Sequence, residues 1–324
     1  MGKGIRILMH LAAVLVVFGG LYSIFAKHKV VVMAGYDEPA MLRGFPYALT
    51  LKEFRIDRYA SGSPLDFVSV LEAQSLDGVS GEVTVRVNAP ARLGRWRIYQ
   101  QGYDTDAGEQ SSYSVLQCVK DPFYPLIAAG LWLLIVSAAL YALRTLWKTG
   151  GRGWIWAVTA VVFALFVYIT MKSVGIGSRD LVPVLRSGWF IPHIVSYMFA
   201  YAMLAVATVY VVVLGIRSRR LEVSRSAWTL GRRFCSVGWA FLTIGMCMGA
   251  LWAKQSWGDW WTFDPKETWA LLTWIGFGAY FHLEPRISTR WRVAMIIVSF
   301  LLLNMCWWGV NLLPSSGSLH TYAM

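Results

Sequence analysis

The chain has few charged residues for its length, and acidic residues are the scarcer kind. Charged residues make up 15% of the 324 residues, whereas soluble domains carry about 25%. Hydrophobic residues make up 56% and the mean hydropathy is +0.49. This composition excludes an ordinary soluble protein. It indicates a chain that folds mostly within lipid, for which the usual relation of length to domain number does not hold.

Cysteine is also scarce, and its spacing excludes several kinds of site. The four cysteines form no C-x-x-C pair: Cys118, Cys235, Cys247 and Cys306. No zinc site and no disulfide framework is supported, and the absence of C-x-x-C-H excludes haem attached covalently to this chain. Three of the four lie in apolar stretches, where cysteine usually acts as a small hydrophobe. Cys118 lies outside these stretches and has no evident partner.

Long apolar runs, in contrast, are abundant. Seven come close to the roughly 20 residues that a helix needs to cross a bilayer. They are 7–26, 124–143, 154–171, 194–216, 234–253, 267–283 and 293–310. The first is longer than the apolar core of a signal peptide and no clean cleavage site follows it, so we expect a retained anchor. The sequence predicts a mainly α, polytopic membrane protein with about seven transmembrane helices.

The basic residues predict how these helices are oriented. With the N-terminus inside, the inner segments hold Lys3, Arg6, Arg144, Lys148, Arg152, Arg217, Arg219, Arg220, Arg225, Arg232, Arg233, Arg286, Arg290 and Arg292. The short outer segments hold only Lys172, Arg179, Arg186, Lys254 and Lys266. Lysine and arginine favour the cytoplasmic side, so the N-terminus should be cytoplasmic and the C-terminus extracytoplasmic. The net charge of +12 then reflects topology, and we expect no nucleic-acid partner.

Residues 27–123 differ from the rest of the chain. Segments 47–51, 67–73 and 83–87 have the composition of strands, and turn formers at 61–64, 77–78 and 88–90 separate them. Their spacing suits a small antiparallel domain. We therefore expect a small β-rich extracytoplasmic domain directly after the first helix.

Only five histidines occur, and four of them fall at informative depths. His10 and His282 lie near the inner ends of their helices, whereas His193 and His320 lie at the outer face. An ionisable group within a membrane is a functional candidate by default, and imidazole is a standard axial ligand of haem iron. The alternative is an interhelical hydrogen bond. His28, between two lysines, is expected to be an interfacial residue.

Residues 252–267, which we call the Trp-rich segment, are predicted to form an outer loop. Rings and charges are crowded here: Trp252, Trp257, Trp260, Trp261, Phe263, Asp259, Asp264, Lys266 and Glu267. Stacked indoles suit the face of a flat ligand, although an aromatic belt at the membrane surface is the simpler explanation. Asp264 before Pro265 equally fits the cap of a helix, with Glu267 three residues later.

The Trp-rich segment resembles the WGxxWxWD signature of the cytochrome c assembly family, the haem-handling proteins that include CcsA. Trp257, Gly258, Trp261 and Asp264 fit this signature, whereas Phe263 stands where the family usually has tryptophan. The likeness continues in 181–189 before His193, in 280–282 at His282 and in 309–322 around His320. Residues 51–59 and 87–103 are similar to ResB/CcsB, the usual partner of CcsA, which makes His10 the candidate membrane histidine of that part.

The resemblance implies a fusion of a shortened ResB-like part with a CcsA-like module. Its expected divisions are a transmembrane helix (1–26), a ResB-like β-rich domain (27–123), a helix with a cytoplasmic linker (124–153) and a CcsA-like haem-handling membrane domain (154–324). The implied function is system II cytochrome c biogenesis in the cytoplasmic membrane. Haem b would be bound without a covalent bond, delivered to the outer face and presented to the C-x-x-C-H motif of an apocytochrome c.

Within that function, the resemblance implies specific roles. His10 and His282 would ligate haem iron first, and His193 and His320 would do so at the outer face. Trp257, Gly258, Trp260, Trp261, Phe263 and Asp264 would cover the porphyrin. Holocytochrome c synthase activity is implied, with a further ResB/CcsB-like subunit and a thioredoxin-like reductant as possible partners. Two alternatives remain open: a membrane b-type haem protein that transfers electrons between quinone and an outer acceptor, and a scaffold that binds no haem.

Overall fold

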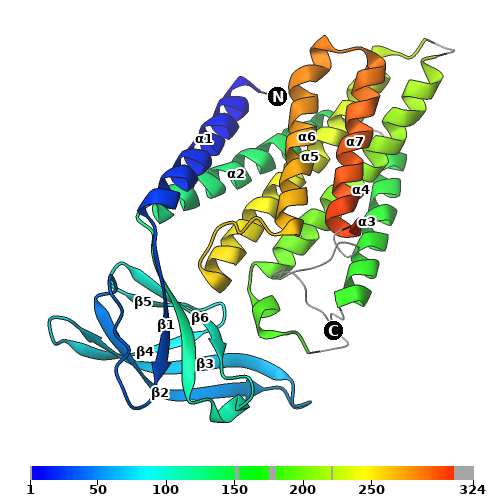
Figure 1. The fold of residues 1–324 in the computed structure, drawn as a ribbon. Helices are drawn as coiled ribbons and strands as arrows, with labels where there is room; N and C mark the ends of the chain where they lie inside the picture. The colour runs from blue at the N-terminus through cyan, green and yellow to red at the C-terminus, as the bar shows by residue number, and fades with distance from the viewer. Residues whose placement is uncertain (1, 150–152, 175–179, 220–221, 310–324) are drawn as a thin grey trace.

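The computed structural model describes residues 2–149, 153–174, 180–219 and 222–309, which form a helical bundle and a β domain below it (Figure 1). The helices of the described residues are α1 (Lys3–Ala26), α2 (Tyr124–Thr149), α3 (Gly153–Val174), α4 (Phe190–Arg217), α5 (Arg225–Trp257), α6 (Pro265–Leu283) and α7 (Thr289–Trp307). Short 3-10 helices lie at Gly108–Gln110 (η1), Pro183–Arg186 (η2) and Glu284–Arg286 (η3). Six of the predicted apolar runs fall within a helix, and the last, 293–310, extends past the end of α7 at Trp307.

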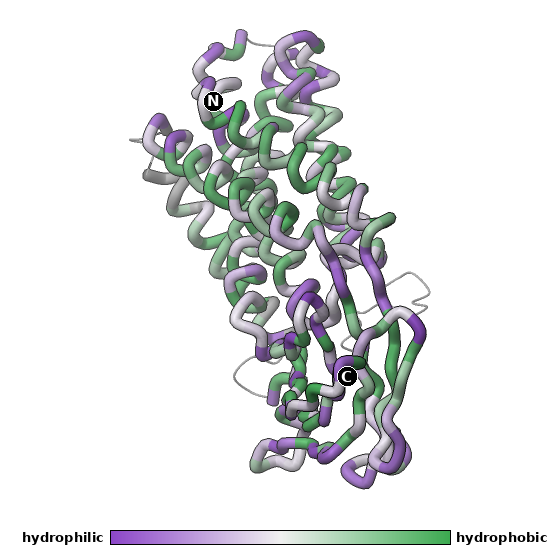
Figure 2. Tube along the Cα trace, turned by 90° about the vertical axis from the view of Figure 1, so that its left-hand side faces the viewer, coloured by the Kyte–Doolittle hydropathy of each residue, from purple (hydrophilic) through white to green (hydrophobic). Residues whose placement is uncertain are grey.

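Five of these helices are long and apolar enough to cross a membrane: α1, α2, α4, α5 and α7. Hydrophobic residues extend along the bundle, and hydrophilic residues gather at its far end and in the β domain (Figure 2). The protein is therefore a multi-pass membrane protein. The predicted number of seven spans stays a prediction, as does the orientation.

Helix α5 is longer than the predicted span of 234–253, because it begins at Arg225 and ends at Trp257. The predicted span ends at residue 253 because Lys254, Gln255 and Ser256 interrupt the apolar run. Lys254 is nevertheless buried and lies 3.4 Å from the Asp121 carboxylate, so the helix continues through the polar residues. The outer loop predicted over 252–267 is correspondingly wrong in its bounds. Only residues 258–264 of the Trp-rich segment lie between helices.

Strands of the β domain form two antiparallel sheets. The strands are β1 (His28–Gly35), β2 (Tyr47–Arg58), β3 (Pro64–Ser75), β4 (Ser80–Arg86), β5 (Ala91–Leu93), β6 (Trp96–Tyr103) and β7 (Tyr113–Lys120). One sheet has the order β1-β7-β6-β5 and the other β2-β3-β4. Their facing apolar side chains, Cys118 among them, form the core. The predicted β domain is confirmed, and its turns fall where the turn formers stand.

The β domain is inserted between α1 and α2. Strand β1 continues α1, strand β7 leads into α2, and the two strands pair from His28 opposite Lys120 onward. The α1–α2 pair and the β1–β7 pair thus form one long antiparallel hairpin (Figure 1). This connection places the β domain against the end of the bundle that carries the Trp-rich segment.

A stripe of glycines brings α4 and α5 into close contact. Four glycines of α5 are spaced by seven, seven and four residues, and a Cβ at each would lie 2.6–2.8 Å from a side chain of α4. The pairs are Gly231 with Val211, Gly238 with Leu204, Gly245 with Tyr197 and Gly249 with His193. Small residues at such spacing let helices in membranes pack at short distance. The contact of Gly249 with His193 fixes where the imidazole lies along α5.

Candidate functional site

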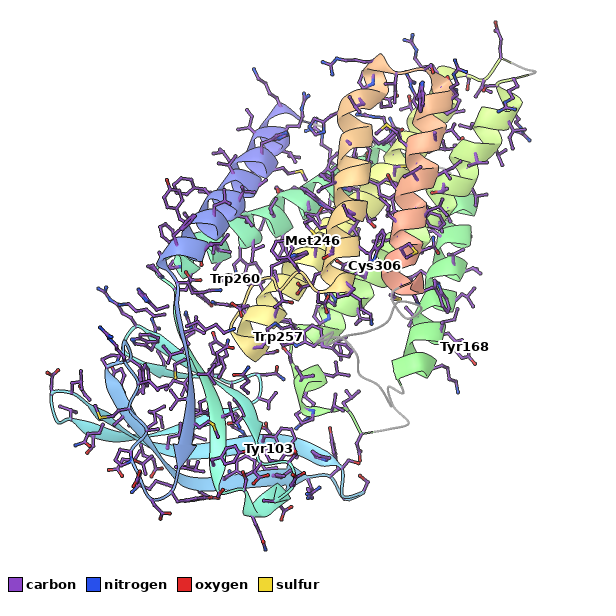
Figure 3. The ribbon with its side chains drawn as sticks, viewed as in Figure 1. Tyr103, Tyr168, Met246, Trp257, Trp260 and Cys306 are labelled. Atoms are coloured by element: carbon purple, nitrogen blue, oxygen red, sulfur yellow. The ribbon has the colours of Figure 1, made fainter. Side chains whose placement is uncertain are left out.

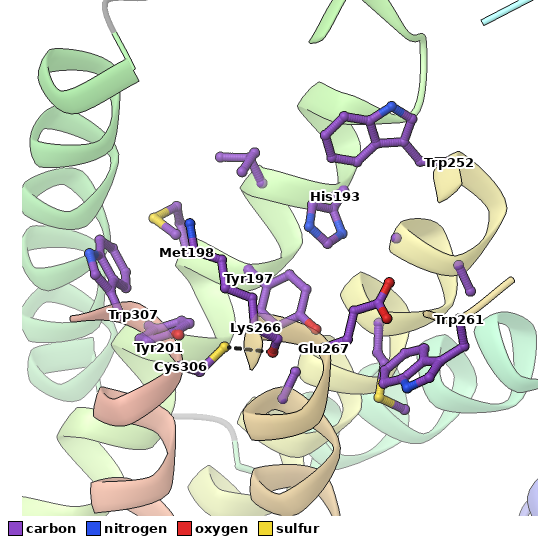
Figure 4. A pocket seen from close by; sticks show the side chains of 15 residues that line it. His193, Tyr197, Met198, Tyr201, Trp252, Trp261, Lys266, Glu267, Cys306 and Trp307 are labelled. Carbon is purple, nitrogen blue, oxygen red and sulfur yellow. Dashed lines mark hydrogen bonds between the residues drawn. The ribbon is translucent and has the colours of Figure 1, made fainter. Parts of the chain in front are cut away.

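A cavity of about 260 Å³ opens between α4, α5, α6 and α7 beside the Trp-rich segment (Figure 4). From α4, His193, Tyr197 and Tyr201 line it at a spacing of four residues, which puts them on one helix face. The other polar and aromatic lining residues are Trp252, Trp261, Lys266, Glu267, Cys306 and Trp307. The cavity therefore combines one imidazole with rings and charged groups.

The hydrogen bond of His193 fixes which ring nitrogen can act as a ligand. Its Nδ1 lies 2.8 Å from the Gly245 carbonyl oxygen. A carbonyl only accepts, so Nδ1 carries the proton and Nε2 carries the lone pair of the neutral ring. The ring also contacts Gly249 and lies edge-on to Tyr197, with centroids 4.7 Å apart. A metal-binding histidine is held by such a bond from its other nitrogen.

Trp261 adds a hydrogen-bond donor to this cavity. Its indole Nε1 is buried and has no hydrogen-bond partner among the described residues. Leaving a buried donor unsatisfied costs about 1–3 kcal/mol, so such groups need an explanation. An acceptor on a bound ligand would supply the missing partner.

The beginning of the Trp-rich segment docks on the β domain. Gly258 ends α5 in the left-handed region at φ +84, and a Cβ there would lie 2.8 Å from the Gln117 amide nitrogen. Gln117 donates from this nitrogen to the Trp257 carbonyl oxygen at 2.6 Å. The glycine is thus required both by its backbone conformation and by the approach of β7. Figure 3 shows Trp257 and Trp260 at this junction, with Met246 and Cys306 inside the bundle.

Asp259 is clamped by two lysines that follow α1. Its carboxylate oxygens lie 2.6 Å from the Lys27 Nζ and 3.0 Å from the Lys29 Nζ. Burial alone would raise the pKa of Asp259, but the hydrogen bonds and charges of the two lysines outweigh burial, and the pKa lies below its ordinary value. Asp259 is therefore ionised, and it joins the Trp-rich segment to α1.

Trp260 packs away from the cavity, toward the start of α2. Its ring lies 5.0 Å from the Tyr124 ring, and its Nε1 donates to the Asp121 carboxylate at 3.4 Å. Lys254 lies 5.3 Å from the centre of the same indole. Of the predicted porphyrin contacts, Gly258 and Trp260 thus contact other parts of the chain, and Trp261 lines the cavity.

Asp264 and Phe263 have different surroundings although they are neighbours. Asp264 is the N-cap of α6, where its carboxylate accepts from the Glu267 backbone N–H at 2.9 Å, and Pro265 is the first helical residue. Of the two roles that the sequence allowed for Asp264, the structure thus shows the helix cap. Phe263 has φ +58 and is 72% exposed, a rare conformation for a bulky residue.

Two other histidines meet at the end of the bundle far from the β domain. His10 of α1 and His282 of α6 have ring centroids 5.8 Å apart. Nδ1 of His10 donates to the Arg6 carbonyl at 2.7 Å, and Nδ1 of His282 donates to the Gly278 carbonyl at 2.8 Å. Both rings thus keep Nε2 as the nitrogen with the lone pair. His28 is exposed, and His320 lies outside the described residues.

Asn88 of the β domain is a docking residue that the sequence interpretation did not identify as one. Its amide nitrogen donates to the carbonyls of Pro183 and Val184 before α4 at 2.9 and 3.1 Å. Its oxygens accept from Gln255 and Ser256 of α5. Asn88 thus joins the β domain to η2, which precedes α4, and to α5. The sequence indicated only a turn at 88–90 and a place in the ResB-like stretch.

A second hollow, of about 480 Å³, lies between the β domain and the Trp-rich segment. Tyr99, Gln101, Trp257 and Asp259 contribute to its walls. No histidine is among the described residues that line it, so of these two cavities only the one beside His193 offers an imidazole. The hollow instead offers amide and aromatic groups next to that cavity.

The imidazoles beside the cavity and at the far end of the bundle are groups that could hold a metal carried in a flat organic ring. Among the residues that the structure describes, no cluster of three His, Cys, Asp or Glu side chains could hold an ion. A macrocycle supplies most of its own metal ligands and needs only one or two axial imidazoles. His193, and separately the pair His10 and His282, meet that requirement.

Comparisons with known proteins agree on one group of relatives. The family model described as "Cytochrome C assembly protein" matches residues 124–316, and the one described as "ResB-like family" matches residues 4–112. Similar curated proteins are named "Cytochrome c biogenesis protein CcsA". That of Prochlorococcus marinus (strain MIT 9312) is 35% identical over 197 residues, which cover 50% of this chain and 62% of the relative.

Two further relatives with this name come from other organisms. That of Chlamydomonas reinhardtii is 34% identical over 157 residues, covering 45% of this chain and 43% of the relative. That of Atropa belladonna is 34% identical over 183 residues, covering 45% and 58%. The chain thus spans less than two thirds of each relative's length. The two family matches are consistent with a ResB-like part fused to a CcsA-like module.

Proposed function

Because the chain belongs to the cytochrome c assembly protein family, we propose that it binds haem b, delivers it to the outer membrane face and presents it there to an apocytochrome c. The acceptor would be the C-x-x-C-H motif of that protein. The chain is a multi-pass membrane protein of cytochrome c biogenesis. We place it in the cytoplasmic membrane, with the Trp-rich segment outside.

The meeting of His10 and His282 is the observation that carries this proposal. The two residues lie at opposite ends of the sequence, yet their rings are 5.8 Å apart. Two imidazoles that ligate one iron from opposite sides, at roughly 2 Å each, would have ring centres about 6 Å apart. The pair therefore has about the ring spacing of two imidazoles that share one iron.

The cavity beside His193 supports a second site at the outer face. There His193 and His320 would be the iron ligands, with Trp261 donating its indole N–H to the bound molecule. The chain holds and orients its substrate, and the reacting groups belong to haem and to the acceptor protein.

The attachment itself is a thiol addition. Each cysteine thiol of the acceptor adds across one vinyl group of haem: sulfur bonds to one carbon and the proton goes to the other, without net oxidation. The acceptor histidine replaces one protein ligand.

The proposal includes holocytochrome c synthase activity, with partners that the chain itself does not supply. A thioredoxin-like protein would keep the acceptor thiols reduced, because a disulfide cannot add to a vinyl group. A further ResB/CcsB-like subunit would complete the shortened ResB-like part. The electron-transfer alternative is not favoured, because the relatives are named for cytochrome c biogenesis.

Co-expression with an apocytochrome c in a host that lacks maturation genes tests this function. We expect covalent haem with the wild-type chain, and a loss of at least ten-fold with His193→Ala or with His10→Ala/His282→Ala. His28→Ala is the matched control, because this exposed histidine lies outside both sites. Unchanged holocytochrome in the site variants would overturn the assignment. A haem that no C-x-x-C-H peptide accepts would favour electron transfer, and the absence of any Soret band would favour a scaffold.

A further inference from the structure

Two arginines stand in matching positions beside the pair His10 and His282. Arg6 precedes His10 by four residues on α1, and Arg286 follows His282 by four residues beyond α6. Helices α1 and α6 run in opposite directions (Figure 1). Both arginines therefore lie on the same side of the histidine pair, farther from the β domain.

The hydrogen bonds tie each arginine to its histidine. The Arg6 carbonyl accepts from His10 Nδ1 at 2.7 Å, and Arg286 Nη1 donates to the His282 carbonyl at 3.2 Å. Arg6 and His10 are four residues apart on α1, so they lie on one face with Cβ atoms about 5–6 Å apart. Arg286 lies in η3 and is held beside His282 by its hydrogen bond. A guanidinium at the end of its long side chain can thus reach the edge of a ligand held between the rings.

Neither arginine has an acidic partner within the part of the chain that the structure describes. Arg232 and Arg292, at the same end of the bundle, both pair with Glu284 at 3.4 and 3.1 Å. No carboxylate of the described residues lies within 4.0 Å of Arg6 or Arg286. Arg6 and Arg286, each hydrogen-bonded to one histidine of the pair, therefore have no acidic partner there and are available to an anionic ligand.

We propose that Arg6 and Arg286 bind the two propionate carboxylates of the haem that His10 and His282 hold. This inference rests on the proposed function and extends it. Guanidinium groups bind carboxylates in a planar, two-bond geometry, which fixes orientation as well as adding binding energy. The propionates then point away from the β domain, and the edge with the vinyl groups points into the bundle. The arginines make the inner site selective for a dicarboxylate porphyrin held in one orientation.

Haem and haem dimethyl ester, whose propionates carry no charge, are the probes for this proposal. Binding of each to the purified full chain is followed by the Soret band, in the His193→Ala background so that the outer site does not contribute. We expect the chain with both arginines to prefer haem over the ester by about 100-fold, at roughly ten-fold for each charge-assisted pair. In Arg6→Gln/Arg286→Gln the two probes should bind equally.

The matched control is Arg290→Gln, an arginine at the same end of the bundle for which the structure gives no contact to either histidine. It should keep the full preference. The ratio of the two affinities is measured within one preparation, so it does not depend on the fraction of folded protein. A preference that persists in the double arginine variant overturns the proposal, while loss of haem in His10→Ala/His282→Ala still supports the proposed function. If His10→Ala/His282→Ala binds haem as the parent chain does, the result contradicts both the arginine proposal and the proposed function.

Discussion

The Lys27 ammonium, directly after α1, lies 2.6 Å from the Asp259 carboxylate of the Trp-rich segment. Helix α1 carries His10, and α6, which carries His282, begins at the end of the same segment. Both histidine helices are thus tied to one loop at their other ends. A movement that separates the two helices at the histidine pair must therefore also act on the Trp-rich segment.

Asp259→Asn should weaken this connection. It removes the charge that both lysines contact, and the loss is expected to lower stability by about 1–3 kcal/mol, since the carboxylate is mostly buried and the hydrogen bonds are charge-assisted. Thermal unfolding in detergent measures the change, and co-expression should show a several-fold lower yield of holocytochrome. The control is Glu72→Gln, which removes an exposed ion pair with Lys52 and should change stability by less than about 1 kcal/mol. Equal effects of the two substitutions would contradict the argument.

The same carboxylate predicts a dependence on pH. Its pKa is lowered in the folded protein from the ordinary value of 3.8. Its contribution is therefore fully present above that value, and it is lost as the pH falls through the lower folded pKa. The difference in unfolding temperature between wild type and Asp259→Asn should be constant from pH 7 to pH 5 and shrink below about pH 4. A difference that stays the same down to pH 3 would show that the charge of Asp259 does not stabilise the junction.

Gly249→Ala should displace His193. The added Cβ would lie 2.8 Å from the His193 Cε1 and 3.0 Å from its Nδ1, so the ring or the helix must move. We expect weaker haem binding at the outer site, read from the Soret band in the His10→Ala/His282→Ala background. Gly188→Ala is the matched substitution near the same helix start, where an added Cβ meets nothing within 4 Å. Its spectrum should equal that of the parent chain.

Trp261→Phe should have opposite effects on the free and the loaded protein. The substitution keeps a ring but removes the buried Nε1–H that has no partner among the described residues. Stability without haem should be unchanged or rise by up to about 1 kcal/mol, whereas haem affinity at the outer site should fall about ten-fold. Thermal unfolding and Soret titration measure the two changes. An unchanged affinity would mean that the indole N–H does not contact the ligand.

Substitutions of Asp264 separate its two predicted roles. Asp264→Ser retains a side-chain oxygen that can cap α6, whereas Asp264→Ala leaves the Glu267 N–H without its partner. Loss of an N-cap costs about 1 kcal/mol, so the alanine variant should be less stable and the serine variant close to wild type. If the serine variant is stable but forms no holocytochrome, Asp264 contacts the ligand in addition to capping the helix.

Much of the fold follows from local patterns that a sequence displays. Apolar runs locate the helices, because a membrane helix must expose apolar residues on nearly all sides. Asp264 and Pro265 locate the start of α6, because a short side chain and a fixed φ act within a few residues. The turn formers at 61–64 and 77–78 likewise separate β2, β3 and β4. These signals are short-range, and they were read correctly.

The candidate site depends more on contacts between distant residues. Lys27 and Asp259 are 232 positions apart, and Gln117 and Trp257 are 140 apart. No local pattern indicates such pairs, since each depends on how the β domain docks. Tyr197 and Tyr201 are different, because their spacing from His193 on one helix face was visible in the sequence and could have placed them in the cavity.

The burial of Cys118 in the β domain has a consequence for thiol chemistry. Burial raises the pKa of this thiol to about 12, and its side chain is inaccessible in the core between the sheets. Only a thiolate exchanges with disulfides or attacks an electrophile. A cysteine-bearing polypeptide that approached this domain would therefore meet no competing thiolate there and form no mixed disulfide with it.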